Sequence, residues 1–339
     1  MEKLTIKGSQ SDSTLLIGES FHNFKKYLPN SKVIVLIDDK VRGIYGKYFS
    51  DYDIIEIGQT EKIKTLSTIE FILEQLLKLK ADRSTFLLAV GGGIVCDIGG
   101  FAASVYLRGI DFGFISTTLL SQVDASVGGK NGVNFRGFKN MVGVFNQPKF
   151  VICDPEMLKT LNTDDLNNGF AEIVKHTLIA DAGMFTKLEQ NVDKALSLDA
   201  AFIEELVLNS IKIKAGIVNK DEKEKGERRK LNLGHTYGHA VEKVLGIPHG
   251  KAVSIGLAVA AKLSYSKNRL TQNELQSIVN LLTSLKLPVK ISEKHNEIID
   301  ALVMDKKREG NSINFVLMNG IGNVTVELIG IDELVRLLD

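Results

Sequence analysis

The chain has 339 residues, 44% of them hydrophobic, and 42 lysines and arginines against 41 aspartates and glutamates give a formal net charge of +1. This balance argues against a nucleic-acid-binding protein, which usually carries a basic excess, although it is compatible with local basic clusters. The length favours two domains over a single core. Two cysteines, Cys96 and Cys153, are too few for a disulfide scaffold and fit a reducing compartment.

The N-terminal half alternates short β-branched runs with helical patterns. Strands are predicted over residues 33–38, 53–58, 85–90, 113–118 and 150–154. The clearest helix is predicted over 67–81, with one face made of Ile69, Leu73, Leu76 and Leu77. Short strands that alternate with helices predict an α/β domain with a mostly parallel sheet covered on both sides.

One apolar stretch of this half raises the question of a membrane span. Residues 86–107 are apolar enough, but they include five glycines and Asp97. A lipid-facing helix tolerates these residues poorly, whereas a buried strand, turn and helix use them well. The start of the chain also lacks the long apolar core of a signal peptide. We therefore expect a cytoplasmic protein that binds no membrane.

The C-terminal half shows almost only helical periodicity. Helices are predicted over residues 164–178, 199–219, 230–244, 250–267, 272–285 and 295–304. Two alternating runs, at 313–318 and 323–328, flank NGIG and predict a β-hairpin near the end of an otherwise all-α domain. The change of pattern places the domain boundary within 155–163 and predicts domains over 1–158 and 159–339.

Residues 89–100, AVGGGIVCDIGG, carry the sharpest turn signal. Three glycines after a buried strand let backbone amides approach a ligand closely, and the N-terminus of a following helix favours a pyrophosphate. The dinucleotide spacing G-x-G-x-x-G is absent, because Cys96 stands where its last glycine would fall. The stretch is therefore a candidate nucleotide site, and a purely structural turn is the alternative.

The next segment is dense in polar groups. Thr117 and Thr118 close a predicted strand, where hydroxyls commonly face a ligand. Further polar residues lie in or beside glycine-rich loops: Asp124, Lys130, Lys139 and Asn140. Arg108 precedes them in the chain. Lysines are solvated surface residues by default, but fixed cations beside glycine turns suit a phosphate or a carboxylate.

Three of the six histidines lie within residues 234–249. His235 and His239 are four apart, so a helix would point them the same way, and His249 follows a Gly-Ile-Pro break. They could meet around a divalent metal, or they could be separate helix and loop histidines that never meet. Glu172, three residues before Lys175 on a largely apolar helix, could supply a further ligand. A Glu/His/His zinc site with open positions is a catalytic arrangement, and a solvated i,i+3 ion pair is the alternative.

Several runs in both halves resemble the 3-dehydroquinate synthase family of the sugar-phosphate cyclase superfamily. They are GGGIVCDIGGFAA, STTLLSQVDASVGGKNGVN, GFKNMVGVFNQP, FAEIVKH, LNLGHTYGHAVE and HGKAVSIG, and the similarity extends from about Asp38 to Lys307. The resemblance implies a Rossmann-like N-terminal domain, a helical C-terminal domain, an active site in the cleft between them and a homodimer.

The resemblance also implies the cofactors and their ligands. Zinc, or cobalt in its place, would be held by Glu172, His235 and His249, while His239 would lie behind these ligands or contact the substrate. NAD would contact a set of residues spread over the N-terminal domain: Asp38, Glu61, Lys64, Gly92, Gly93, Asp97, Thr117, Thr118, Asp124, Lys130, Lys139, Leu158 and Thr160.

The implied reaction converts 3-deoxy-D-arabino-heptulosonate 7-phosphate to 3-dehydroquinate and phosphate, in the shikimate pathway to chorismate and the aromatic amino acids. It proceeds by transient oxidation by NAD, β-elimination of phosphate, reduction, ring opening and intramolecular aldol closure. The residues implied to meet this substrate are polar or cationic: Lys130, Asn140, Lys175, Lys214, Arg228, Asn232, His239, a lysine of the pair Lys306 and Lys307, and Arg108 from the dimer mate.

The sequence departs from the family pattern at a few positions. Lys40 stands where an asparagine is common near the ribose, and Lys251 replaces a frequent glutamate. Three other functions remain as alternatives. They are another sugar-phosphate cyclase on the same scaffold, a glycerol-dehydrogenase-like metal-dependent alcohol dehydrogenase, and a non-catalytic nucleotide- or metal-binding regulator.

Overall fold

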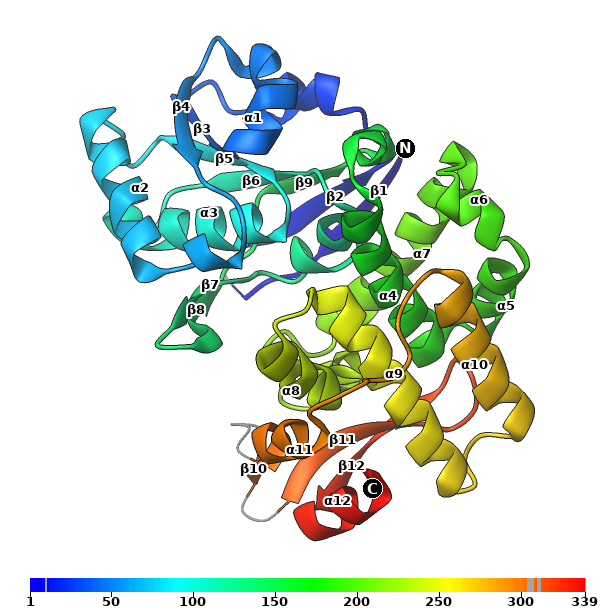
Figure 1. Cartoon of the computed structure of the whole chain (residues 1–339). Helices are drawn as coiled ribbons and strands as arrows, with labels where there is room; N and C mark the ends of the chain where they lie inside the picture. The colour runs from blue at the N-terminus through cyan, green and yellow to red at the C-terminus, as the bar shows by residue number, and fades with distance from the viewer. Residues whose placement is uncertain (10, 304–307, 310–311, 339) are drawn as a thin grey trace. The chain divides into compact units, whose positions relative to one another are not determined.

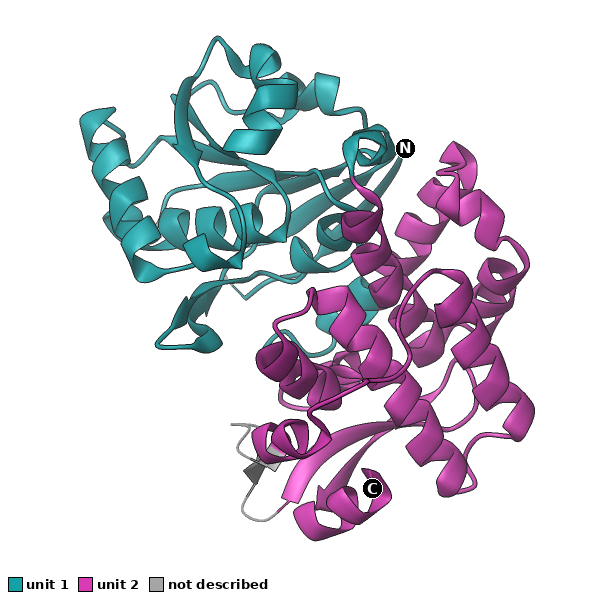
Figure 2. Ribbon diagram, viewed as in Figure 1, with its two compact units in different colours: residues 1–161, 214–223 teal, residues 162–213, 224–339 magenta. Residues whose placement is uncertain are grey.

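The computed structural model describes residues 1–9, 11–303, 308–309 and 312–338 (Figure 1). The chain forms two compact units (Figure 2). Unit 1 comprises Met1–Leu161 and Lys214–Lys223, and unit 2 comprises Asn162–Ile213 and Glu224–Asp339. A ten-residue piece of the second half of the chain is thus part of unit 1, which brings Lys214 into the unit that carries the glycine-rich turn.

Unit 1 is built on a seven-stranded sheet of order β1-β2-β9-β6-β5-β3-β4. All neighbouring strands are parallel except β1 and β2, so the predicted mostly parallel α/β sheet is confirmed. Each predicted strand is present within two residues of its expected bounds. The strands are β1 Glu2–Ile6, β2 Ser13–Ile17, β3 Val33–Asp38, β4 Asp53–Ile57, β5 Phe86–Gly91, β6 Phe112–Ser116 and β9 Phe150–Cys153.

Helices cover both faces of this sheet. On one face α1 (Asp39–Tyr45) packs with the 3-10 turns η1 (Phe21–Tyr27) and η2 (Gly46–Phe49) in a core of aromatic and β-branched side chains. On the other face lies α3 (Gly93–Val105) (Figure 1). A Cβ on Gly99 of α3 would lie 2.8 Å from the Cβ of Ala89, so α3 approaches β5 closely.

Helix α2 (Leu66–Lys78) buries a face that differs in part from the predicted one. Ile69, Ile72 and Leu76 are buried, whereas Leu77 is 65% exposed. A spacing of three and four residues selects these three side chains, and Leu77 lies a full 100° around the helix from Leu76. The prediction is therefore confirmed for Ile69 and Leu76 and wrong for Leu77, and Ile72 completes the buried face.

The predicted glycine-rich loops around Lys130 and Lys139 are in fact a hairpin of two strands, β7 (Lys130–Phe135) and β8 (Phe138–Phe145). Gly132 and Gly143 face each other across it, and a Cβ on Gly132 would lie 2.5 Å from the carbonyl oxygen of Val142. These glycines allow the two strands to approach closely. In the sequence alone, glycines with this role look the same as glycines in a loop.

The strand order of unit 1 reverses at β3. From β3 the chain proceeds to the edge strand β4 and then returns to β5 on the other side of β3. In open α/β sheets, ligands bind outside the carboxyl ends of the strands at such a reversal. Asp38 ends β3 and Gly91 ends β5, so the two stretches predicted to bind a nucleotide lie at this point.

Unit 2 is mostly helical, with a small antiparallel sheet, as predicted. Its helices are α4 Thr163–Ala180, α5 Ala182–Gln190, α6 Val192–Leu196, most of α7 Ala200–Val218, α8 His235–Leu245, α9 His249–Ser266, α10 Gln272–Ser284, α11 His295–Val303 and α12 Ile331–Leu338. The predicted hairpin is β11 (Ser312–Met318) with β12 (Val324–Gly330), and a two-residue strand, β10 (Arg308–Glu309), extends it. In the described part of the chain, none of the helices is long and apolar enough to cross a membrane.

Helices α8 and α9 pack closely against each other in unit 2. A Cβ on Gly256 of α9 would lie 1.9 Å from the carbonyl oxygen of Gly234, the residue before α8, so only a glycine fits there. The preceding 3-10 turn η7 (Glu227–Asn232) ends at Asn232, and Gly234, with a left-handed φ of 75°, is the residue before α8, which starts at His235. This explains why the helix predicted from residue 230 begins later.

Candidate active site

Glu172 and Lys175 lie in the middle of α4, whose first turn is capped by Asn162 accepting a hydrogen bond from the amide of Asp165. Their side chains form an ion pair and are 0% and 2% exposed. The alternative of a solvated ion pair on a helix surface is therefore wrong. A buried carboxylate among apolar neighbours is available for chemistry that a surface pair could not support.

His235 and His249 both approach the same oxygen of Glu172. His249 Nε2 lies 3.3 Å and His235 Nε2 lies 3.5 Å from Glu172 Oε1. Each of the three residues offers one ligand atom within 4.8 Å of the other two. The alternative that these histidines never meet is thus wrong, and the start of α8, the start of α9 and the middle of α4 supply the cluster.

The ring nitrogens of His235 and His249 that face away from Glu172 each contact an oxygen atom. His235 Nδ1 lies 3.1 Å from the carbonyl oxygen of Leu233, which can only accept, so Nδ1 carries the hydrogen. His249 Nδ1 lies 3.3 Å from Glu242 Oε2. Metal-binding histidines characteristically donate the other ring N–H to a carbonyl or carboxylate. The donor set and its second contacts therefore fit a zinc ion with open coordination positions.

The surroundings of His249 favour the form of its ring that carries a proton on both nitrogens, which is a cation. Burial lowers its pKa, but hydrogen bonds to the carboxylates of Glu172 and Glu242 outweigh burial and raise the pKa to about 10. A metal ion between His249 and Glu172 would take the place of that proton, because the metal binds the neutral ring.

His239 lies beside the cluster without being part of the Glu172 group. Its ring centroid is 5.2 Å from that of His235 and 6.1 Å from that of His249. It also forms a second group of possible ligands with Glu242 and His249. His239 thus lies next to the three candidate ligands, and its role stays a prediction.

Two of the predicted substrate-binding residues of unit 2, Arg228 and Asn232, lie in η7. Arg228 is 2% exposed, and Asn232 donates a hydrogen bond to Glu224 Oε1 at 2.5 Å. The two remaining candidates, Lys306 and Lys307, lie outside the described residues.

In unit 1 the glycine-rich turn joins β5 to α3. The residue before α3, Gly92, provides no side-chain cap, so the first amides of the helix are offered to a ligand. A Cβ on Gly92 would lie 3.0 Å from Cγ2 of Thr118, and one on Gly93 would lie 2.7 Å from Cβ of Ala125. Thr117 and Thr118 follow the last residue of β6 rather than ending it, and they stand next to the turn.

Two sets of predicted site residues meet in unit 1. Lys64 forms an ion pair with Asp97, and its Nζ also donates to Asn140 Oδ1 at 2.6 Å. Burial raises the pKa of Asp97, and the charge of Lys64 acts in the opposite direction. Glu61 lies 3.8 Å from Lys139 Nζ. Residues predicted to bind cofactor thus adjoin Asn140, which was predicted to meet the substrate.

A second pair in unit 1 connects Lys214 with Asp124. Lys214 Nζ lies 2.8 Å from Asp124 Oδ1 and donates to the carbonyl oxygen of the same residue at 2.5 Å. Two candidates that are more than eighty residues apart in the sequence are therefore in direct contact. The contact keeps an ammonium group near the segment that follows Thr118.

The other predicted positions of unit 1 are at the ends of strands or in turns. Asp38 accepts a hydrogen bond from the amide of Val41 at 2.8 Å, which caps α1, and burial raises its pKa. Leu158 is buried, and the hydroxyl of Thr160 lies 3.1 Å from that of Tyr45. Arg108 is exposed with a left-handed φ of 69°, and Lys130 is exposed at the first residue of β7.

The structure adds two carboxylates that the sequence did not single out. Glu242 contacts His249 and Glu224 contacts Asn232. Glu242 follows His239 by three residues, a spacing that places both on one side of a helix and could have drawn attention to it. Glu224 lies in the charged run 221–230, where spacing alone does not distinguish one carboxylate from another.

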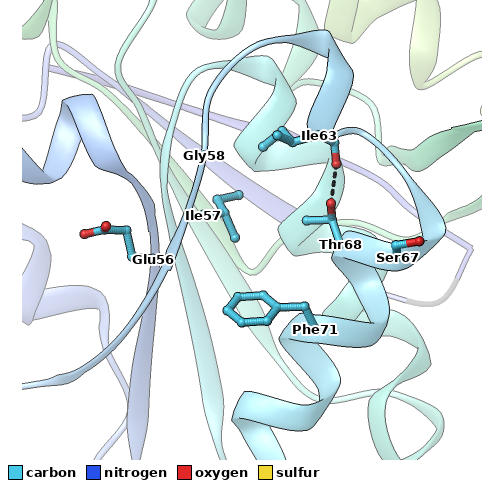
Figure 3. Close-up of a pocket in the computed structure, with 7 residues that line it drawn as sticks. All are labelled: Glu56, Ile57, Gly58, Ile63, Ser67, Thr68 and Phe71. Atoms are coloured by element: carbon cyan, nitrogen blue, oxygen red, sulfur yellow. Dashed lines mark hydrogen bonds between the residues drawn. The ribbon is translucent and has the colours of Figure 1, made fainter.

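A pocket of about 360 Å³ lies elsewhere in unit 1, between β4 and α2 (Figure 3). The hydroxyl of Thr68 inside it donates to the carbonyl oxygen of Ile63 at 2.6 Å. None of the predicted site residues that the structure describes lines this pocket. It is lined by Glu56, Ile57, Gly58, Ile63, Ser67, Thr68 and Phe71.

Comparison with known proteins gives two adjoining family matches. The 3-dehydroquinate synthase N-terminal family matches residues 54–168, and the 3-dehydroquinate synthase C-terminal family matches residues 169–308. The 3-dehydroquinate synthase of Coxiella burnetii (strain RSA 331 / Henzerling II) is 43% identical over 303 residues, which cover 88% of this chain and 84% of that protein.

Solved structures of related cyclases have the same fold. A 2-epi-5-epi-valiolone synthase from Streptomyces hygroscopicus subsp. jinggangensis 5008, with NAD+ and Zn2+ bound, gives a TM-score of 0.89 at 26% identity, covering 98% of this chain and 97% of that one. A 2-deoxy-scyllo-inosose synthase complexed with carbaglucose-6-phosphate, NAD+ and Co2+ gives 0.86 at 25% identity, covering 99% of each chain. Both family matches and the relative of higher identity lead to one assignment: the chain belongs to the 3-dehydroquinate synthase family, whose members are carbon–oxygen lyases of the shikimate pathway.

Proposed function

We propose that this chain converts 3-deoxy-D-arabino-heptulosonate 7-phosphate to 3-dehydroquinate and phosphate, with a divalent metal held by Glu172, His235 and His249 and with NAD bound by unit 1. The convergence of both Nε2 atoms on Glu172 Oε1 is the observation that carries the proposal. When bound, the metal would supply Lewis acidity toward a substrate hydroxyl, and NAD would supply reversible hydride transfer.

The strand reversal at β3 supports the NAD site. A dinucleotide would lie outside the ends of β3 and β5, with its pyrophosphate at the N-terminus of α3. Gly92 and Gly93 leave room for it, because any larger residue would meet Thr118 or Ala125. Both related cyclases contain NAD+. The further cofactor residues named above are proposed as its contacts, with Asp38 toward the adenosine half.

The cationic and amide residues are proposed to hold and orient the substrate. Arg228, Lys175 and Lys214 suit the phosphate and carboxylate of the substrate, because charge-assisted hydrogen bonds to oxyanions are the strongest that side chains form. Their existing carboxylate partners fix two of these cations in place: Glu172 for Lys175 and Asp124 for Lys214. A reactant held in this way reacts faster because its orientation is already set.

A different sugar-phosphate cyclase is the competing function, since two such enzymes share the fold at TM-scores of 0.89 and 0.86. Their identities of 26% and 25% are well below the 43% of the Coxiella burnetii 3-dehydroquinate synthase. The set of cations that fits a substrate with both a phosphate and a carboxylate also favours the heptulosonate phosphate.

We further propose that the chain acts as a homodimer in the cytoplasm, with Arg108 reaching the substrate of the partner, and that it binds no nucleic acid. The near-neutral charge supports the proposal that the chain binds no nucleic acid, and the two buried free cysteines support a reducing compartment. The homodimer and the role of Arg108 follow from the family resemblance. Sedimentation at micromolar concentrations tests the dimer, and a monomer would contradict it.

Phosphate release tests the proposed function. The zinc-loaded protein with NAD is given the heptulosonate phosphate in one assay and glucose 6-phosphate in another. We expect phosphate and 3-dehydroquinate from the first substrate and neither from the second. No phosphate from a folded, zinc-loaded protein would refute the proposal, and release from glucose 6-phosphate alone would favour an inosose-type cyclase.

A further inference from the structure

His249 contacts a carboxylate with each of its ring nitrogens. Nε2 lies 3.3 Å from Glu172 Oε1, and Nδ1 lies 3.3 Å from Glu242 Oε2. His235 has a different second contact, the backbone carbonyl of Leu233 at 3.1 Å. The second acceptor is therefore a backbone carbonyl for His235 and a side-chain carboxylate for His249.

Glu242 is placed for this contact by the fold of unit 2. Its side chain is 7% exposed and lies on α8, which packs against the helix that His249 begins. Burying a carboxylate is costly unless a hydrogen-bonded or charged partner compensates. The imidazole of His249 is such a partner, so the burial of Glu242 and the position of the His249 ring depend on each other.

We propose that Glu242 is a positioning residue for the metal ligand His249. Its carboxylate accepts the Nδ1 hydrogen, which fixes the tautomer and orients the ring so that Nε2 faces Glu172. The negative charge also makes Nε2 a stronger donor to a metal. This inference rests on the metal site of the proposed function and assigns a task to a residue outside the ligand set.

A second metal is the competing arrangement, because His239, Glu242 and His249 also offer ligand atoms within 4.8 Å of one another. Such a site would require His249 to lose the hydrogens of both ring nitrogens and to bridge two cations. A neutral imidazole that donates to Glu242 avoids this. The number of zinc ions bound per chain distinguishes the two arrangements.

The test compares Glu242→Gln and Glu242→Ala with the parent protein. Zinc affinity is measured by competition with a chromophoric chelator, and ligand geometry by the visible absorption of the cobalt-loaded protein. We expect zinc affinity to fall by about 100-fold in Glu242→Ala and by about tenfold in Glu242→Gln, whose amide oxygen still accepts from Nδ1 but carries no charge. The cobalt spectrum should change most in Glu242→Ala.

Lys243→Gln is the matched control, since Lys243 is the next residue of α8 and is exposed. Its zinc affinity and cobalt spectrum should equal those of the parent. Thermal unfolding of the metal-free variants shows whether they fold. If Glu242→Ala does not fold, Glu242→Gln, which has the same shape as the parent residue, carries the test.

Zinc affinity within twofold of the parent in Glu242→Gln, with an unchanged cobalt spectrum, would overturn the inference. Two zinc ions per parent chain that fall to one in the Glu242 variants would also overturn it, in favour of a second metal. Failure of the proposed function would look different. The parent would bind no zinc, or Glu172→Gln would bind it as tightly as the parent.

Discussion

Glu172 and Lys175 form an ion pair with almost no access to solvent, in which the two side chains are 0% and 2% exposed. Removing one partner from a buried pair strands the other charge in a medium of low polarity. An exposed pair of similar geometry behaves differently, because water already solvates both charges. The energetic role of Lys175 can therefore be separated from its proposed contact with substrate.

We predict that Lys175→Met lowers the free energy of unfolding of the metal-free protein by about 3 kcal/mol. This is the lower end of the range for a broken buried pair, because His249 remains beside Glu172. Zinc bound as proposed would supply positive charge at the same carboxylate, so the loss should be smaller in the zinc-loaded protein. Urea denaturation with a chelator and with zinc measures both.

Lys187→Met is the control for this experiment. Lys187 pairs with Glu205 at 2.5 Å, but the two side chains are 48% and 40% exposed. Its removal should cost less than about 1 kcal/mol, with or without zinc. Equal losses in the two variants would contradict the buried-pair account of Lys175.

The pKa of His249 should make the proposed zinc binding depend on pH. At about 10, this pKa lies above the ordinary value of about 6.5 for histidine. The extra proton therefore stabilises the metal-free fold fully below about pH 6.5, and this contribution is lost as the pH rises toward 10. Zinc has the opposite requirement, because it binds only the deprotonated Nε2.

We predict that zinc binding at pH 7 releases about one proton from His249, so that zinc affinity rises about tenfold per pH unit between pH 7 and 9. Calorimetry in buffers of different ionisation enthalpy counts the proton. Heats that are independent of the buffer, or an affinity that is constant over this range, would show that His249 is neutral before zinc binds.

At the scale of elements, the sequence predicted the main strands and helices better than it predicted contacts between neighbouring strands. The strands at 33–38 and 85–90 are short and apolar, and the structure buries them, so local pattern and burial agree. The hairpin of β7 and β8 was missed because of its glycines. Gly132 and Gly143 allow the two strands to approach closely, and a sequence does not distinguish such glycines from glycines in a loop. Prediction from local sequence patterns thus fails where the choice of residue depends on contact with a neighbouring strand.

The candidate site was predictable to a similar extent. Glu172, His235 and His249 meet as expected, because the residue types of a metal site are few and their motifs are specific. Glu242 was missed, since its contact with His249 depends on the packing of α8 against α9. Ligands can be recognised by their chemistry, whereas the residues that orient them are visible only in the fold.

Helix α10 offers a test of an element that was predicted from the sequence within one residue. Thr271 and Glu274 form a capping box, in which Thr271 Oγ1 accepts from the amide of Glu274 and Glu274 Oε2 accepts from the amide of Thr271. This backbone hydrogen bond, with help from the Thr271 hydroxyl, lowers the pKa of Glu274. Its stabilisation is therefore present above the usual carboxyl pKa and is lost as the pH falls through the lowered value.

We predict that Thr271→Ala lowers the free energy of unfolding by about 1 kcal/mol at neutral pH, because the first turn of α10 loses its cap. Thr271→Ser keeps the hydroxyl and should lose only a few tenths of a kcal/mol. Denaturant midpoints at neutral pH measure both. The same loss in the alanine and serine variants would mean that the hydroxyl does not stabilise the helix.

At the scale of the whole molecule, two units carry different parts of the chemistry. Unit 1 has the strand reversal and glycine turn suited to a dinucleotide, and unit 2 has the carboxylate and imidazoles suited to a metal. The function proposed above connects these parts in one reaction. That reaction oxidises and then reduces its substrate, so the protein should use NAD as a catalyst rather than consume it.

The ratio of phosphate released to NAD present tests this claim most directly. The zinc-loaded protein is given one equivalent of NAD and a large excess of the heptulosonate phosphate, while phosphate and NADH absorbance are followed together. We predict many phosphates per NAD with no lasting accumulation of NADH. One NADH formed per substrate consumed, with no phosphate released, would contradict the account and identify a simple dehydrogenase.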